Sequence, residues 1–126
     1  MPGERILIVD DNPQNLKLVR VLFGAEGYEV RTAGDAEEAL AMLPSFAPHL
    51  ILMDIQLPGM DGLELTRRLK ADPVWQHLPV VALTAYAMKG DEERARAAGC
   101  DGYVSKPLDI DLLSRTVTRL LMTEAR

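Results

Sequence analysis

The chain has few of the residues that form disulfides or bind zinc: one cysteine, Cys100, and two histidines, His49 and His77, among 126 residues. A single thiol cannot close an intramolecular disulfide, and no cysteine or histidine pair stands at the spacing of a metal site. We therefore expect both histidines to be ordinary surface or loop residues. Cys100 is expected to be a small buried core residue rather than a redox sensor.

Long hydrophobic segments are also absent. No apolar run approaches the ~18 residues that a membrane-spanning helix needs. The polar residues from Met1 to Arg5 lead directly into a short apolar run and do not have the pattern of a signal peptide. We therefore expect a cytoplasmic protein that has no membrane partner.

Basic residues are in the minority, since 14 Lys and Arg stand against 19 Asp and Glu, for a net charge of −5. A nucleic-acid-binding surface needs positive charge to neutralise phosphates. The charge balance therefore argues against nucleic acid as a partner, although a local basic patch is compatible with an acidic total.

The composition is otherwise that of an ordinary globular domain, with 48% hydrophobic and 26% charged residues. A chain of this length suits one domain, and it contains no linker, low-complexity segment or shift in composition. We therefore expect a single domain over residues 1–126, whose core needs neither a disulfide nor a structural metal.

Three short runs are apolar at every position: residues 6–9, 50–53 and 80–83. Runs without polar alternation are typical of parallel strands that are covered on both faces. Residues 29–33 and 102–105 form weaker runs, which we predict to be flanking or edge strands.

Helix signals fill the spaces between these strands. The predicted helices cover residues 13–26, 36–43, 62–71, 89–98 and 110–122. The signals are N-cap residues at the starts (Asn12, Asp35, Asp61, Asp109) and glycines after two of the ends (Gly27, Gly99). A strand followed by a helix, five times over, predicts an α/β fold: a doubly wound (βα)5 parallel sheet with helices on both faces.

Polar residues follow the predicted strands at their carboxyl ends. Asp10 and Asp11 follow the first strand, Asp54 the third, Thr84 the fourth and Lys106 the fifth. Ligands of open α/β sheets bind at this edge, so we expect the five side chains to gather there. Each residue taken alone also has an ordinary explanation, such as an acidic group before a helix or a turn after a strand. Their coincidence at one edge favours a site.

Three carboxylates at one place repel each other unless a cation binds. Oxygen ligands without histidine or cysteine suit Mg²⁺. Three carboxylates, Lys106 and one Mg²⁺ ion carry charges of −3, +1 and +2, which sum to zero. A neutral pocket that holds a metal and a lysine can receive a phosphoryl group, and Thr84 can donate a hydrogen bond to one of its oxygens.

Four segments together resemble the motifs of response-regulator receiver domains: Val9-Asp-Asp-Asn12, Leu52-Met-Asp-Ile-Gln-Leu-Pro-Gly-Met-Asp-Gly62, Leu83-Thr-Ala85 and Ser105-Lys-Pro107. The resemblance covers essentially the whole chain, in the usual order and spacing. Residues 55–58 and 85–94 are similar to single-domain cell-cycle response regulators and to receivers of hybrid histidine kinases. The resemblance implies a flavodoxin-like sheet with strand order 2-1-3-4-5.

The resemblance also implies a magnesium site. Asp11, Asp54 and the backbone carbonyl of Gln56 match the direct ligands of the ion. Asp10 matches a neighbouring carboxylate that reaches the ion through water. We expect no other cofactor.

A phosphorylation switch of a two-component system or phosphorelay is the function that the resemblance implies. Asp54 matches the phosphoacceptor, Lys106 its ion-pair partner, and Thr84 the hydroxyl that turns toward the phosphoryl group. Tyr103 matches the aromatic residue that changes rotamer on activation. Such a protein is not an enzyme acting on a separate substrate, because it catalyses only its own phosphorylation and dephosphorylation.

The implied partners are a histidine kinase or histidine phosphotransfer protein as donor, and a downstream protein bound at the fourth helix, fifth strand and fifth helix. The first predicted helix has a broad apolar arc, which either deeper burial or docking of such a donor explains (Leu16, Leu18, Val19, Val21, Leu22, Phe23, Ala25).

Two alternatives differ in kind from a stand-alone regulator. The first is a receiver excised from a hybrid histidine kinase; the start at Met1 and the short polar end favour a complete small protein instead. The second is a Mg²⁺-dependent phosphohydrolase of the haloacid-dehalogenase type. That class needs a second acid two residues after its nucleophile, where this chain has Gln56, and its cap domain has no room in 126 residues.

Overall fold

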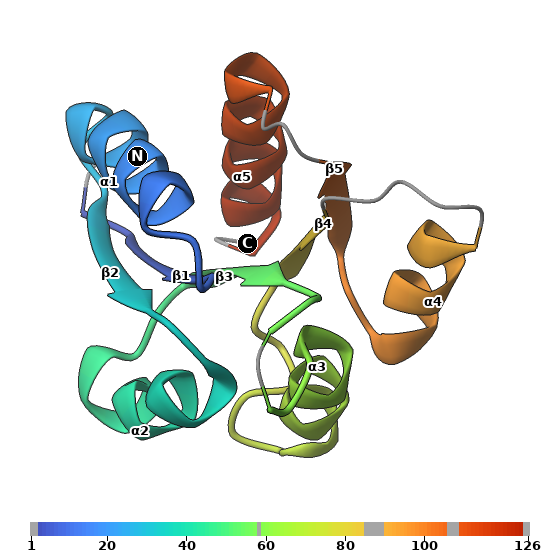
Figure 1. Ribbon diagram of the computed structural model, residues 1–126. Helices are drawn as coiled ribbons and strands as arrows, with labels where there is room; N and C mark the ends of the chain where they lie inside the picture. The colour runs from blue at the N-terminus through green and yellow to red at the C-terminus, as the bar shows by residue number, and fades with distance from the viewer. Residues whose placement is uncertain (1–2, 58, 85–89, 106–108, 125–126) are drawn as a thin grey trace.

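The computed structural model describes residues 3–57, 59–84, 90–105 and 109–124, which alternate between strands and helices (Figure 1). The elements are β1 (Arg5–Val9), α1 (Pro13–Ala25), β2 (Glu29–Ala33), α2 (Ala36–Phe46), β3 (Leu50–Asp54), α3 (Gly62–Ala71), β4 (Val80–Thr84), α4 (Asp91–Ala98), β5 (Gly102–Ser105) and α5 (Ile110–Glu124). All strand pairs are parallel, in the order β2-β1-β3-β4-β5. The flavodoxin-like fold and its strand order are therefore confirmed.

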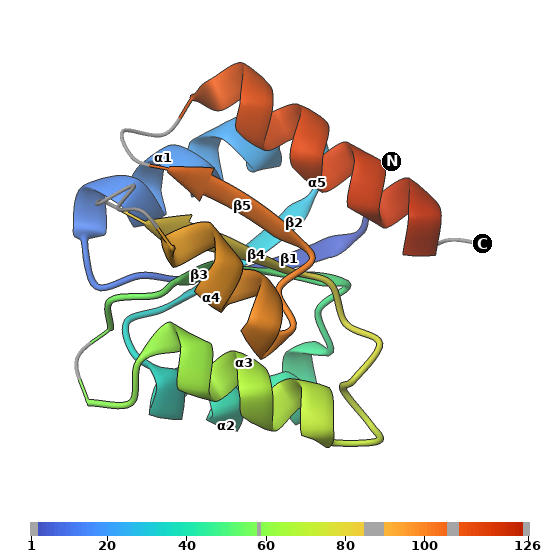
Figure 2. The same cartoon turned by 90° about the vertical axis from the view of Figure 1, so that its right-hand side faces the viewer.

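Helices cover both faces of the sheet. Helices α1 and α5 lie on one face, and α2, α3 and α4 lie on the other (Figure 1). Figure 2 shows β5 between α5 on one side and α4 on the other. Within β1, Ile6 and Ile8 belong to the core under α1 and α5, while Leu7 and Val9 belong to the opposite core. This two-sided burial is why the central strands are apolar at every position.

Most helix boundaries follow their local signals. Asn12 caps α1, because its Oδ1 accepts hydrogen bonds from the backbone N–H of Gln14 (2.8 Å) and of Asn15 (3.4 Å). The same role falls to Asp35 at α2 and Asp61 at α3. The predicted starts of these three helices are confirmed.

Four predicted boundaries differ from the structure. Helix α1 ends one residue earlier than predicted, at Ala25, and α5 ends two residues later, at Glu124. Helix α2 was expected to end before Pro44 but continues to Phe46. Pro44 lies in the exposed last turn and lacks the N–H that would bond the turn before it, but burial of Phe46 favours the extension. Helix α4 begins at Asp91 rather than at residue 89, because Gly90 has a φ of +94° and stands outside the helix as its N-cap. Lys89 lies outside the described residues.

Cys100 takes the structural place expected of it. Trp75, before β4, packs against the core under α2, α3 and α4, and Cys100 is buried in that core. In the part of the chain that is described, no helix combines the length and the apolar character required to cross a membrane.

Candidate functional site

Acidic residues converge at the carboxyl edge of the sheet. Asp54 is the last residue of β3, and Asp10 and Asp11 follow directly after β1. Because β1 and β3 are paired in parallel, with Val9 opposite Met53, the three residues stand at one level. Each offers a carboxylate oxygen, and these oxygens all lie within 4.8 Å of one another. The structure thus brings together the three carboxylates that the sequence placed at this edge.

Asp10 is fully buried and is held by the start of α1. Its Oδ1 accepts the backbone N–H of Asn12 at 2.9 Å, and its Oδ2 accepts a hydrogen bond from the Asn15 side-chain amide at 3.2 Å. Asp11 is exposed. One carboxylate is therefore fixed by protein donors, while its neighbour faces solvent at the mouth of the site.

Asp54 is 3% exposed, and its carboxylate is oriented by its own loop. Its Oδ1 accepts the backbone N–H of Gln56 at 2.9 Å, a local turn of the kind that aspartate favours. The Gln56 side chain is exposed. Gln56 thus lies in the loop that orients the Asp54 carboxylate, and its role as a backbone ligand stays a prediction.

Gly62 is a residue of the site that the sequence analysis did not single out. A Cβ on Gly62 would stand 2.3 Å from the backbone oxygen of Asp54 and 2.8 Å from the Cα of Ile55. The N–H of Gly62 donates to the Ile55 carbonyl at 3.3 Å. The sequence signal was the glycine directly after the N-cap Asp61, since glycine is needed where two backbones approach closely.

Thr84 and Tyr103 lie next to each other at the same edge. Thr84 is fully buried at the end of β4, and Tyr103 is half-buried on the neighbouring strand β5. Burial raises the pKa of Tyr103, and the carboxylate of Asp91 raises it further, while a side-chain hydrogen bond with Thr84 lowers it. The two residues predicted to act as a switch are therefore in contact. Lys106, the fifth predicted site residue, lies outside the described residues, and its place stays a prediction.

The donor set fits a magnesium ion. Mg²⁺ binds oxygen ligands at about 2.0–2.1 Å in an octahedron, so its ligand oxygens stand about 3 Å to about 4 Å apart. Carboxylate oxygens within 4.8 Å of one another come close to this spacing. Their mutual repulsion also makes a cation favourable at this point.

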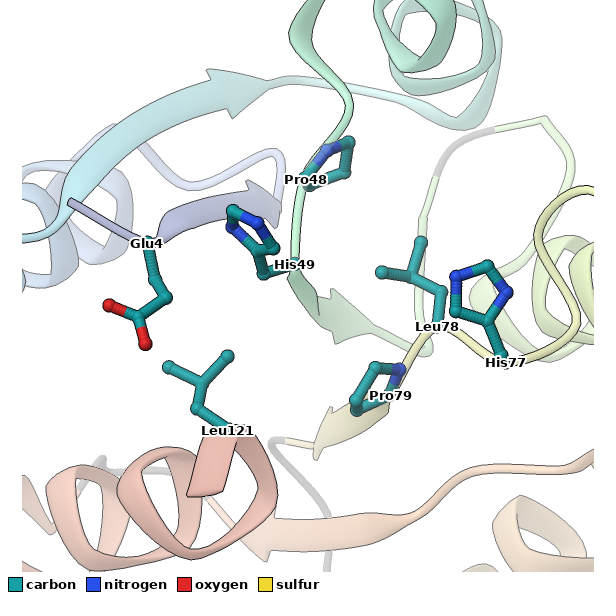
Figure 3. A pocket seen from close by; sticks show the side chains of 7 residues that line it. All are labelled: Glu4, Pro48, His49, His77, Leu78, Pro79 and Leu121. Atoms are coloured by element: carbon teal, nitrogen blue, oxygen red, sulfur yellow. The ribbon is translucent and has the colours of Figure 1, made fainter. Parts of the chain in front are cut away.

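The two histidines line a different cavity, at the amino ends of the strands (Figure 3). Its volume is about 390 Å³, and its other lining residues are Glu4, Pro48, Leu78, Pro79 and Leu121. His49 is tied to β1, because its Nδ1 accepts the backbone N–H of Arg5 at 2.9 Å. Both histidines are exposed, as predicted. Neither belongs to a metal cluster: among the described residues, the only group of histidine, cysteine and acidic side chains that could hold a metal is Asp10, Asp11 and Asp54.

Known proteins match this chain over nearly its full length. The family model of the response regulator receiver domain matches residues 6–118. The polar-differentiation response regulator DivK of Brucella anthropi is 48% identical over 116 residues, which are 92% of this chain and 94% of that protein.

Solved structures agree with this match. The receiver domain of a signal transduction histidine kinase from Syntrophus aciditrophicus has a TM-score of 0.89 and 32% identity, covering 96% of this chain and 92% of that one. The receiver domain of the sensor histidine kinase PA1611 from Pseudomonas aeruginosa has a TM-score of 0.85 and 34% identity, covering 94% and 98%. That second structure has a magnesium ion coordinated in its active site cleft.

Proposed function

This chain belongs to the family of response-regulator receiver domains, and from that premise we propose that it is a phosphorylation switch whose phosphoacceptor is Asp54. The observation that carries the proposal is the cluster of Asp10, Asp11 and Asp54, with carboxylate oxygens within 4.8 Å of one another. Asp54 is the member of the cluster that ends the central strand β3.

Mg²⁺ is the proposed cofactor, held by Asp11, Asp54 and the backbone carbonyl of Gln56, with Asp10 acting through water. When bound, the ion supplies positive charge for the oxygens of the transferred phosphoryl group. The magnesium ion of the Pseudomonas receiver supports this assignment. So does the absence of histidine and cysteine from the carboxylate cluster among the described residues.

In the proposed phosphoryl transfer, Asp54 is the nucleophile, and the residues around it orient the reacting groups. An Asp54 carboxylate oxygen forms a bond to phosphorus, while the phosphorus–nitrogen bond of a donor phosphohistidine breaks. The electron pair stays on the imidazole nitrogen, which takes a proton from solvent. The Gln56 N–H orients the attacking carboxylate through Oδ1, and Asn12 and Asn15 keep Asp10 in place. These contacts lower the cost of organising the reacting groups.

The response follows from the new charge. Phosphorylation replaces a −1 carboxylate with a group of about −2 charge. Thr84 donates a hydrogen bond to a phosphoryl oxygen, Lys106 forms an ion pair with it, and Tyr103 changes rotamer as Thr84 moves. The chain acts as a signalling protein that catalyses only its own phosphorylation and dephosphorylation.

The proposed partners are proteins. A histidine kinase or histidine phosphotransfer protein donates the phosphoryl group and docks on α1, whose apolar arc is only partly buried: Val21 is 62% exposed, while Val19 and Phe23 are buried. A downstream protein binds the face of α4, β5 and α5, where Ile110 and Leu112 are exposed. Nucleic acid and membranes are not proposed as partners, and the proposed location is the cytoplasm.

The proposed organisation is a single receiver domain over residues 1–126 that works as a stand-alone regulator. The match to 94% of the Brucella regulator supports this reading. The alternative is a receiver of a hybrid histidine kinase, which the similarity to the Syntrophus and Pseudomonas kinase receivers favours.

Labelling by a small phosphodonor tests the function. Acetyl phosphate with Mg²⁺ is expected to add one phosphoryl group to the wild type, and Asp54→Asn is expected to abolish the added mass. The matched control is Asp61→Asn, because asparagine keeps the N-cap of α3 and only the charge is lost. Equal labelling of Asp54→Asn and wild type would overturn the assignment of Asp54. Labelling that chelation of Mg²⁺ leaves unchanged would overturn the assignment of the metal.

A further inference from the structure

Asn15, on the first turn of α1, has a partly buried amide that contacts the acidic site. Its Nδ2 donates a hydrogen bond to Asp10 Oδ2 at 3.2 Å. An ionised carboxylate only accepts hydrogen bonds, so the amide must present its nitrogen to Asp10. The neighbouring side chains of Gln14 and Lys17 are exposed, whereas that of Asn15 is only partly so. This amide is therefore placed for a specific contact and does not belong to the solvated surface of the helix.

Asp10 is costly to bury, because it has no exposed surface and lies beside two further carboxylates. Its two oxygens bond to different groups at the start of α1. Oδ1 accepts the backbone N–H of Asn12 at 2.9 Å, and Oδ2 accepts the Asn15 amide. Contacts at both oxygens fix the plane of the carboxylate, which a contact at one oxygen alone would not do.

The cap of α1 brings the Asn15 side chain within reach. Asn12 Oδ1 accepts the backbone N–H of Gln14 at 2.8 Å and of Asn15 at 3.4 Å, so the cap fixes the backbone of Asn15. Helical side chains lean toward the N-terminus of their helix, which here is the turn that follows Asp10. The same short segment therefore positions both the amide and the carboxylate that accepts from it.

We propose that Asn15 is a positioning residue of the magnesium site, which holds the Asp10 carboxylate in one orientation and thereby strengthens the binding of Mg²⁺. Without the amide, this carboxylate would have to be ordered when the ion binds and not when the chain folds. Loss of a group that orients a metal ligand typically weakens metal binding about 10- to 100-fold. The binding of the ion rests on the proposed function, whereas the coupling of Asn15 to Asp10 in the metal-free protein does not.

The first experiment is a double-mutant cycle in metal-free protein. Asn15→Leu removes the amide at similar volume, and Asp10→Ala removes the acceptor. Urea unfolding is measured for the wild type, both single variants and the double variant. Relative to its own background, Asn15→Leu is expected to be more destabilising in the wild type than in Asp10→Ala. The helix preference and apolar surface of leucine act in both backgrounds and cancel in the cycle. Equal effects of Asn15→Leu in the two backgrounds would overturn the positioning of Asp10.

The second experiment measures the dissociation constant of Mg²⁺ for unphosphorylated protein, from the amide NMR signals of residues 11 and 54. Asn15→Leu is expected to raise this constant by up to about tenfold, the lower end of such effects, because Asp10 is proposed to reach the ion through water. Gln14→Leu is the matched control, since it makes the same change of an amide to leucine at the adjacent exposed position. It should bind Mg²⁺ as wild type does. An unchanged constant in Asn15→Leu would overturn the proposal, and so would equal weakening in both variants.

The outcomes separate this proposal from the proposed function. If the wild type binds no Mg²⁺ at residues 11 and 54, the magnesium site is wrong, and so is the role of Asn15 in metal binding. The metal-free cycle would still decide whether Asn15 positions Asp10. If the wild type binds Mg²⁺ and accepts a phosphoryl group while Asn15→Leu keeps the wild-type affinity, the proposed function stands and the role of Asn15 is overturned.

Discussion

The backbone of Gly62 rests directly on that of Asp54: a Cβ at Gly62 would stand 2.3 Å from the Asp54 carbonyl oxygen. The start of α3 is held there by the Gly62 N–H, which donates to the Ile55 carbonyl at 3.3 Å. Within α3, the buried Thr66 hydroxyl donates to the Gly62 carbonyl at 2.8 Å. Helix α3 therefore supports the backbone of Asp54, the proposed phosphoacceptor. This contact depends on the missing side chain and not on an unusual backbone angle.

Gly62→Ala is expected to displace α3 from Asp54. Overpacking of this kind costs about 1–3 kcal/mol of unfolding free energy, and the shifted acceptor carboxylate should be phosphorylated more slowly. Urea unfolding and the rate of labelling by acetyl phosphate measure the two effects. Gly24→Ala is the matched control, because that position is exposed within α1 and a Cβ there meets nothing within 4 Å. The control should be stabilised by about 0.5–1 kcal/mol. A Gly62→Ala protein as stable and as reactive as wild type would contradict the support role.

Replacement of the Thr84 hydroxyl separates phosphorylation from response. Thr84→Val keeps the shape of this buried side chain but removes the group that bonds Tyr103 and, as proposed, the phosphoryl group. Labelling of Asp54 should persist, while the beryllofluoride-dependent change of the Tyr103 NMR signals is lost. Thr84→Ser, which keeps the hydroxyl, should retain the change. Lys106→Ala is expected to behave as Thr84→Val does. A normal Tyr103 response in Thr84→Val would show that the hydroxyl does not carry the signal.

Local patterns were sufficient to predict most of the fold. The continuous apolar runs of β1, β3 and β4 identified buried parallel strands, and the residues after those runs identified the acidic site. This worked because in a parallel sheet all carboxyl ends lie at one edge, so position in the sequence determines position in space. The convergence of Asp10, Asp11 and Asp54 needed no knowledge of side-chain packing.

The features that escaped prediction depend on tertiary contacts. Asp91 stands in the polar segment Asp91-Glu92-Glu93, which reads as a solvated helix start, yet only the first of the three is buried. Lys70 reads as a surface residue, but its Nζ donates to the Leu78 carbonyl at 2.8 Å and to Asp101 at 2.9 Å. No local periodicity distinguishes these side chains from their exposed neighbours. Their environment exists only after β4 and β5 have paired.

Cys100 is expected to react slowly with thiol reagents in the folded protein. Burial raises the pKa of its thiol, which a hydrogen bond to Thr66 partly opposes. The thiolate is the reactive form, so alkylation by iodoacetamide at pH 8 should be much slower in native than in urea-unfolded protein. Because the pKa is higher in the folded state, the stability from this group is complete below about pH 8.5 and is lost as the pH rises through the folded value. Equal alkylation rates in the two states would contradict the buried-core role.

Magnesium is expected to stabilise the folded protein through the carboxylate cluster. Without metal, Asp10, Asp11 and Asp54 repel each other, so replacement of Asp11 by asparagine should raise the unfolding free energy of the metal-free protein. Mg²⁺ at 100 times its dissociation constant should add about 2.7 kcal/mol to the wild type by mass action. Asp11→Asn should lose most of that gain, because it removes a proposed ligand.

Four urea unfolding curves test this expectation: wild type and Asp11→Asn, each with and without millimolar Mg²⁺. Asp35→Asn is the control, since Asp35 caps α2 away from the carboxylate cluster and asparagine preserves the cap. The control should respond to Mg²⁺ as wild type does. In Asp11→Asn the unfolding free energy is expected to change in opposite directions under the two conditions. Without metal it rises because repulsion is lost, and with Mg²⁺ the gain from the metal falls because a ligand is lost. A general change in surface charge would not separate the two conditions in this way. Both the repulsion and the metal site would be contradicted by one outcome: without metal the wild type is at least as stable as Asp11→Asn, and Mg²⁺ does not change its unfolding free energy.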